Sequence, residues 1–198
     1  MARRIAWIVT LLLVAGCAAR SPSPSLWRLE PVAAMPAAWE ADAASVYVGP
    51  VEVPRYVDRS EIMQRTGPSR LEPEALHRWA EPLDDAILRL IGEELARRLA
   101  SSRVVTYPEQ PRMAVDYQVS VRLARLDGRM GETVDLVARW SLADADSGEV
   151  VAFAREDISE PAGDTMEAFV GAHAAALSEL AARIAAAIRA MPPGPGGT

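Results

Sequence analysis

The sequence predicts an α/β fold of the α+β kind, in which a mixed sheet containing a three-strand antiparallel meander packs against two long helices. Three observations support this prediction. Apolar and polar residues alternate over two consecutive segments between residues 113 and 142, as they do in strands with one buried face, and a third strand is expected around residues 150–158. An apolar stripe with helical spacing precedes these segments, and a second such stripe follows them.

Short strands are expected in the first quarter of the chain. Residues 26–29 alternate as a first strand, which Pro31 ends. Residues 32–45 are Ala-rich and are expected to be irregular or to form one helical turn. Residues 45–54 are a β-branched run that predicts a core strand, bending or ending near Gly49-Pro50.

The next region carries no clear period. Residues 55–65 mix charged and apolar side chains, and a turn cluster follows at residues 66–69. The sequence therefore predicts a loop here, with at most a short strand at Ile62.

A helix is expected from Pro82 to about Ala100. Proline suits the first helical position, while acidic residues in the first turn and arginines in the last complement the helix dipole. A short buried strand at residues 103–108 is expected next. The apolar stripe of the helix comprises Leu83, Ile87, Leu90, Ile91, Leu95 and Leu99.

From Met113 the apolar period changes to two. The alternation runs through residues 115–123 and 134–142, a third strand is expected around residues 150–158, and turn residues lie between the segments. Consecutive strands joined by short turns pair in an antiparallel manner, so the sequence predicts a meander with one solvated face.

A second long helix is expected after residue 164. Asp164 and Glu167 make a plausible capping pair at its start. Its predicted apolar face comprises Phe169, Val170, His173, Leu177, Leu180, Ile184, Ile188 and Met191.

The amino terminus has the pattern of a bacterial lipoprotein leader. Arg3 and Arg4 precede an uncharged apolar run at residues 5–15, far short of the ~20 residues that a spanning helix needs. The run ends at Val14-Ala15-Gly16-Cys17, which resembles a lipobox and holds the only cysteine of the chain. This resemblance implies cleavage before Cys17 and acylation of its sulfur. The alternative is an ordinary leader with a chance cysteine.

The expected domain organisation follows from this leader. Several acyl chains would make a permanent anchor, whereas one chain binds a membrane only marginally. Alanine rather than aspartate follows the cysteine, which in enteric-type bacteria implies sorting to the outer membrane. The Pro- and Ser-rich tether should be extended and reach roughly 25 Å. The predicted parts are a signal peptide at 1–16, a lipidated tether at 17–25, one folded domain at 26–191 and a disordered tail at 192–198.

The charge balance argues against two classes of partner. All 21 basic residues are arginines, and the 27 acidic residues give a net charge of −6. Removal of the two leader arginines would leave 19 against 27, a net charge of −8. Nucleic acids and anionic lipid headgroups attract basic proteins, so neither is an expected partner. Membrane attachment must then come from the lipid on Cys17.

Catalytic motifs are missing from the sequence. His173 lies on an apolar helix face, where a core histidine is the more common interpretation, and His77 has no serine elbow to act on. Asp84 and Asp85 are adjacent on a helix and face different ways. The turn at Asp144 does not fit a calcium loop, and there is no glycine-rich phosphate loop. The sequence predicts a protein that is not an enzyme and uses no metal or cofactor.

Several short motifs in a fixed order resemble the ABC-type transport auxiliary lipoproteins, the PqiC-like family, over about residues 26–190. One departure is Leu26-Trp27-Arg28-Leu29, where the family tends to have Tyr-rich aromatic residues. The motifs are Val48-Gly49-Pro50-Val51 with Val53-Pro54, Tyr56-Val57-Asp58-Arg59, Arg65, Arg78-Trp79-Ala80-Glu81-Pro82-Leu83, Tyr107-Pro108 and Ala138-Arg139-Trp140-Ser141-Leu142.

The resemblance implies a non-enzymatic lipoprotein at the periplasmic face of the outer membrane. It would be the auxiliary component of an ABC/MCE-type system that moves lipid between the inner and outer membranes. Its partner would be an MCE-domain protein, whose outer-membrane end it would hold in place, and homo-oligomerisation stays open. The implied fold resembles the anticodon-binding or TolB amino-terminal type.

One segment is a candidate for binding this partner. We expect residues Tyr56 to Arg65, together with Trp79, to form or brace the partner-facing surface, because tryptophan is enriched at interface hot spots. The alternative is that Asp58 and Arg59 pair within a loop while Trp79 fills the core beneath it. The candidate residues are Tyr56, Asp58, Arg59, Ile62, Arg65 and Trp79.

Two other functions remain open at this stage. A tethered α/β domain could instead activate a peptidoglycan synthase of the envelope. It could also carry lipid itself, which would require a lined cavity.

Overall fold

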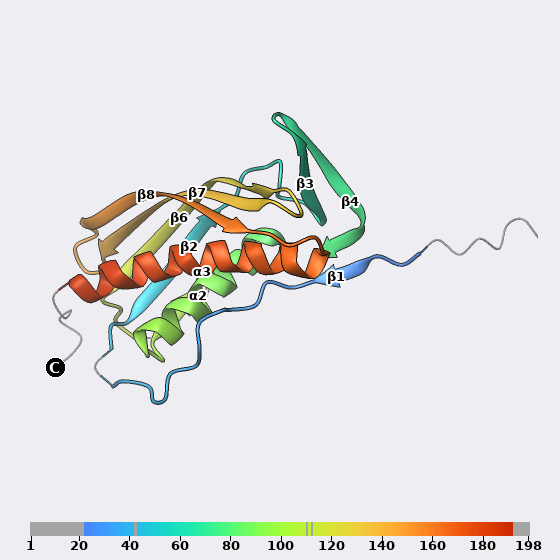
Figure 1. Cartoon of the computed structure of the whole chain (residues 1–198). Helices are drawn as coiled ribbons and strands as arrows, with labels where there is room; N and C mark the ends of the chain where they lie inside the picture. The colour runs from blue at the N-terminus through green and yellow to red at the C-terminus, as the bar shows by residue number, and fades with distance from the viewer. Residues whose placement is uncertain (1–21, 42, 110, 112, 192–198) are drawn as a thin grey trace, which may run out of the picture.

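The computed structural model describes residues 22–191 except 42, 110 and 112. The expected leader, the acylation site at Cys17 and the expected tail at 192–198 therefore lie outside the described residues. The main layer is a five-stranded mixed sheet with the order β5-β2-β6-β7-β8 (Figure 1). Its strands are β2 (Val46–Glu52), β5 (Val104–Thr106), β6 (Tyr117–Gly128), β7 (Thr133–Asp144) and β8 (Val150–Pro161).

The predicted meander is confirmed. Strands β6, β7 and β8 pair antiparallel in sequence order, whereas β2 runs parallel to both β5 and β6. The predicted bend in β2 is also present, as a register shift between Val48 and Val51. Gly49 lies at this bend with φ of 129°, and a Cβ there would come within 2.6 Å of the Tyr107 Cβ. Only glycine fits both constraints.

Both predicted helices are present and cover one face of the main sheet (Figure 1). These are α2 (Leu83–Leu99) and α3 (Met166–Ala190), and every residue of the predicted α2 stripe is buried. The even-numbered residues 134–142 of β7 are also buried, so this face of the sheet meets the helices. The α+β class predicted from the two periods is therefore confirmed. No helix in the described part of the chain is both long and apolar enough to cross a membrane.

The predicted cap of the last helix is wrong. The N-cap is Thr165 rather than Asp164, and its hydroxyl accepts a hydrogen bond of 3.2 Å from the Ala168 amide. Both residue types are strong N-caps, so the backbone conformation decides between two adjacent candidates.

The loop predicted for residues 55–69 is largely wrong. Strands β3 (Glu61–Gly67) and β4 (Arg70–Trp79) form an antiparallel hairpin that projects from one end of the main sheet (Figure 1). We call this hairpin the arm. The first strand, β1 (Ser25–Trp27), pairs in parallel with β4 to complete a three-stranded sheet. Pro73 and the neighbouring acidic residues disfavour a strand locally, but pairing on both sides of β4 overrides this preference.

The segment after β1 is fastened to helix α2. The buried carboxylate of Glu94 accepts hydrogen bonds from the amides of Val32 and Ala33, at 2.5 and 2.9 Å. Arg89 donates to the Leu29 carbonyl oxygen over 2.8 Å. The described residues between β1 and β2 are irregular, as predicted, but these side chains hold them in place.

Candidate functional site: the arm base and the open sheet face

The six predicted surface residues do not form one surface. Ile62 and Trp79 are buried in the core, which leaves them only the bracing role. Asp58 and Arg59 are exposed, and the Arg59 Nε lies 3.1 Å from the Glu61 Oε2. The remaining two, Tyr56 and Arg65, belong to a polar cluster at the base of the arm.

This arm-base cluster consists of Tyr56, Arg65, Arg125, Asp127 and Asp135. The Tyr56 hydroxyl donates to Asp127 over 2.8 Å, and the Arg65 Nη2 donates to Asp135 over 2.7 Å. Arg125 reaches both carboxylates at 3.1 Å. The Asp127 side chain is only 8% exposed. The cluster thus ties the arm to strands β6 and β7.

The environment of the cluster shifts the pKa values of its members. Burial, followed by the hydrogen bond to Asp127, raises the pKa of Tyr56 from 10.0 to about 12. Burial alone would raise the pKa of Asp135, but hydrogen bonds from Arg65 and Ser159 outweigh it and lower this pKa. The phenol therefore stays protonated and the carboxylate stays ionised at neutral pH. These protonation states suit a cluster that holds the arm to the main sheet better than they suit an acid or base catalyst.

Both histidines contact neighbouring residues of the fold. His173 is buried, and its Nδ1 lies 2.8 Å from the Phe169 carbonyl oxygen. The Trp79 and Phe169 rings meet it edge-on, at centroid distances of 5.7 and 4.7 Å. Burial lowers the pKa of His173 to about 4. His77 accepts a hydrogen bond of 2.9 Å from the Trp27 Nε1. The interpretation of His173 as a core residue is confirmed.

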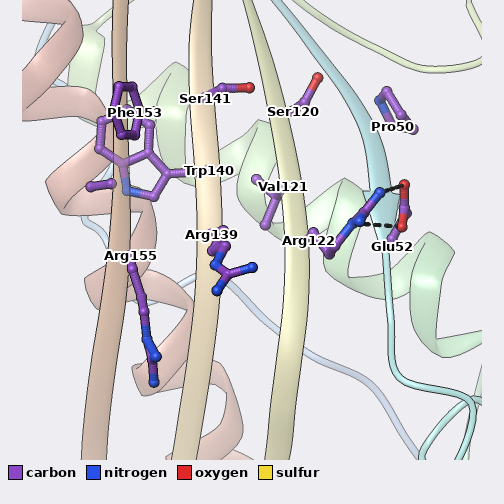
Figure 2. Close-up of a pocket in the computed structure, with 11 residues that line it drawn as sticks. Pro50, Glu52, Ser120, Val121, Arg122, Arg139, Trp140, Ser141, Phe153 and Arg155 are labelled. Atoms are coloured by element: carbon purple, nitrogen blue, oxygen red, sulfur yellow. Dashed lines mark hydrogen bonds and ion pairs between the residues drawn. The ribbon is translucent and has the colours of Figure 1, made fainter.

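The face of the main sheet opposite the helices carries a second feature. A shallow depression of about 640 Å³ lies over β2, β6, β7 and β8 (Figure 2). We call its surroundings the open sheet face. Two cross-strand rows line it, and strand register places them side by side. The first row is Ser120, Ser141 and Phe153, and the second is Arg122, Arg139 and Arg155.

The three arginines of this second row, which we call the arginine row, differ in their partners. Arg122 forms a two-point ion pair with Glu52, with both N–O distances at 2.8 Å. Arg155 lies 3.0 Å from Asp157. Arg139, between them, makes no hydrogen bond or ion pair within the described residues, and no dashed line reaches it in Figure 2. Among the described residues of the arginine row, Arg139 is therefore the one without a carboxylate partner.

Comparison with known proteins shows the family of this chain. Residues 27–185 match the family model of the ABC-type transport auxiliary lipoprotein component. The chain belongs to this family. Members are transport auxiliaries rather than an enzyme family, and membership implies a membrane-anchored location in the cell envelope. No curated protein is similar enough in sequence to count as a relative.

Solved structures share the fold of this auxiliary lipoprotein at low sequence identity. The crystal structure of an uncharacterized protein has 19% identity and a TM-score of 0.69, covering 84% of this chain and 99% of its own. A Xanthomonas campestris protein of the DUF330 family has 17% identity and a TM-score of 0.65, covering 81% of this chain and 92% of its own. At such identities the likeness concerns the fold alone.

Sequence reasoning missed the open sheet face of this auxiliary lipoprotein as a site. In the sequence, Arg139, Trp140 and Ser141 were noted only as parts of one family motif, and none was predicted to bind a ligand. The alternation of β7 separates them, since Trp140 is buried and donates from its Nε1 to Glu156 over 3.3 Å. The same period of two would have placed residues 139 and 141 outward. Their neighbours across the strands depend on register, which the sequence does not give. No group of three or more metal-ligating side chains occurs in the part of the chain that the structure describes.

Proposed function

We propose that this auxiliary lipoprotein is anchored in the outer membrane by lipid on Cys17 and binds an MCE-domain protein in the periplasm. In this role it holds the outer-membrane end of an ABC/MCE-type lipid transport system in place. The observation that supports this most directly is the family match over residues 27–185. The match names a transport auxiliary, and an auxiliary acts through a partner.

A lipid anchor makes a weak docking contact sufficient. Confinement to the outer membrane raises the effective concentration of the anchored domain near the outer-membrane end of its partner. The proposed tether, residues 17–25, ends at Ser25, which is already the first residue of β1. Arg89 and Glu94 fasten the chain that follows β1 to α2. The amino-terminal end of the folded domain would therefore face the membrane, and the tether would allow a separation of roughly 25 Å.

Substitution of the proposed acylation site tests the anchor. Cys17→Ser should abolish acylation and leave the precursor uncut by the lipoprotein peptidase, because the sulfur is the acceptor of the lipid. Metabolic labelling with a fatty acid and membrane fractionation measure both effects. Ala18→Ser, next to the site, is the matched control and should mature as the wild type does. Normal maturation of Cys17→Ser would contradict the lipoprotein proposal.

Co-purification from crosslinked membranes tests the partner. The full-length protein should recover an MCE-domain protein together with its ABC transporter. Recovery of a peptidoglycan synthase in its place would contradict this proposal and support the activator function. Lipid extraction followed by mass spectrometry would show whether the domain also carries lipid.

A further inference from the structure

The arginine row is an unusual arrangement for an exposed sheet. Strand register places Arg122 opposite Arg139, and Arg139 opposite Arg155. Like charges directly opposite each other on neighbouring strands destabilise a sheet. The row therefore lowers stability locally, which points to a function for these charges beyond folding.

The charges are arranged as a centre and a rim. Glu52 and Asp157, the carboxylates that pair with the outer arginines, stand at the sides of the row, on β2 and further along β8. Arg139 has no such partner within the described residues, and it is exposed. Binding energy concentrates at the centre of an interface, so Arg139 has the position of an anchor for an anion.

Polar and apolar groups surround this anchor. The hydroxyl groups of Ser120 and Ser141 line the depression, and neither has a hydrogen-bond partner in the part of the chain that is described. Phe153 stands beside Ser141 and is 81% exposed, which is extreme for an aromatic residue (Figure 2). The site thus offers cationic and hydroxyl donors next to an apolar side chain.

We propose that the open sheet face binds an acidic segment of a partner protein, with Arg139 holding a carboxylate and Phe153 covering an apolar side chain. A guanidinium pairs with a carboxylate through two hydrogen bonds, and arginine clusters recognise acidic motifs. Strand β8 is the last strand in the sheet order, so its outer edge can also pair with an extended backbone. The net charge of −6 makes the arginine row a distinct target for a negative segment.

The same chemistry disfavours the other occupants. The depression is open, and Phe153 and Pro50 are its exposed apolar side chains, so the acyl chains of a lipid would remain in water. The negative net charge of the protein would repel the phosphates of a nucleic acid. An acidic peptide uses the guanidinium, the hydroxyl groups and the aromatic ring together.

This inference rests on the proposed function in one respect, that the protein acts by binding a partner protein. It names the surface and the chemistry of the segment bound. It does not depend on the partner being an MCE-domain protein.

A direct binding measurement tests the surface. The probe is a short fluorescent peptide of alternating Glu and Leu, titrated with the full-length protein in an uncharged detergent and followed by fluorescence anisotropy. Arg139→Glu should weaken binding about tenfold or more, and Phe153→Ala should weaken it severalfold. Arg70→Glu, on the arm with a side chain 75% exposed, is the charge-matched control and should bind as the wild type does. A Gln/Leu peptide should bind weakly, and added salt should weaken the Glu/Leu peptide.

Three outcomes would overturn the inference. One is equal peptide binding by the wild type and Arg139→Glu. A second is Arg139-dependent binding of phosphatidylglycerol vesicles without peptide binding, which would assign the site to lipid. A third is an oligomer that Arg139→Glu dissolves while the peptide does not compete, which would assign the face to a second copy of the chain.

Crosslinked membranes separate this inference from the proposed function. If the wild type and Arg139→Glu recover an MCE-domain protein equally, the surface is wrong and the function stands. If the peptide binds in an Arg139-dependent manner and no MCE-domain protein is recovered, the surface stands and the function is wrong.

Discussion

The arginines at the base of the arm and the central arginine of the open sheet face have different surroundings. In the arm-base cluster, Arg65 and Arg125 both reach the carboxylates of Asp127 and Asp135. On the open sheet face, Arg139 reaches none within the described residues. At the arm base the arginines are partly buried, and a charge that is partly removed from water needs a partner. Water solvates the exposed guanidinium of Arg139. The arm-base cluster should therefore govern stability and the arginine row binding.

At neutral pH the largest effect is expected from removing Asp127, the buried carboxylate of the arm-base cluster. Asp127→Ala removes the acceptor of Tyr56 and one of the two partners of each arginine, and we expect a loss of about 2–3 kcal/mol in the free energy of unfolding. Urea denaturation monitored by circular dichroism measures it. Asp157→Ala, which removes an exposed partner of Arg155, should change stability by less than about 0.5 kcal/mol. Equal losses in the two variants would contradict the comparison.

A pH titration sharpens the comparison at a second buried group. Burial lowers the pKa of His173 from 6.5 to about 4. The neutral ring is therefore fully compatible with the fold above pH 6.5, and stability is lost as the pH falls from 6.5 towards 4. This shift corresponds to roughly 3 kcal/mol. The slope of unfolding free energy against pH in this window should flatten in His173→Gln, a result that an exposed histidine would not give.

Tyr56 gives a smaller effect at the opposite end of the pH scale. Its pKa is raised to about 12, so its stabilising contribution is complete below pH 10 and is lost as the pH rises from 10 towards 12. Tyr56→Phe should remove this dependence and cost about 1 kcal/mol at neutral pH. Ultraviolet difference titration would show one late-ionising phenol fewer. Because the pKa of Tyr117 is also raised, by burial first, the wild type must be compared directly with Tyr56→Phe.

The smallest effect on stability is expected on the open sheet face. Arg139→Gln and Phe153→Ala should each change the free energy of unfolding by less than about 0.5 kcal/mol, since both side chains are exposed. Arg139→Gln should, if anything, stabilise the sheet by relieving the repulsion in the arginine row. Thermal unfolding measures both variants. A loss of about 2 kcal/mol or more would show that these residues serve the fold.

The elements that the sequence predicted well have one long, uniform period. Strand β7 alternates in burial over residues 133–142, β6 does so as far as Leu123, and helix α2 keeps its stripe from Leu83 to Leu99. In each of them a single face meets the core. The arm was missed since it buries few residues, such as Ile62 and Met63, and has no complete apolar face. Strand β4 gains its stability from hydrogen bonds to β1 and β3, and such pairing leaves no period in its own sequence.

The candidate site residues were also predicted from the sequence only in part. Sequence reasoning singled out Tyr56 and Arg65, which the structure does bring together, but their carboxylate partners lie about seventy residues further along the chain. It also grouped Ile62 and Trp79 with them, although both side chains face the core. Proximity along the chain does not fix the direction of a side chain once the backbone forms a strand.

The sequence by itself determined the class of fold, the two helices, the meander and the family, because these depend on local periodicity and on motifs in a fixed order. The tertiary structure alone decided that three arginines lie in one row and that the central one has no hydrogen-bond or ion-pair partner among the described residues. Register between strands sets such neighbours, and register follows from the packing of the whole sheet against α2 and α3.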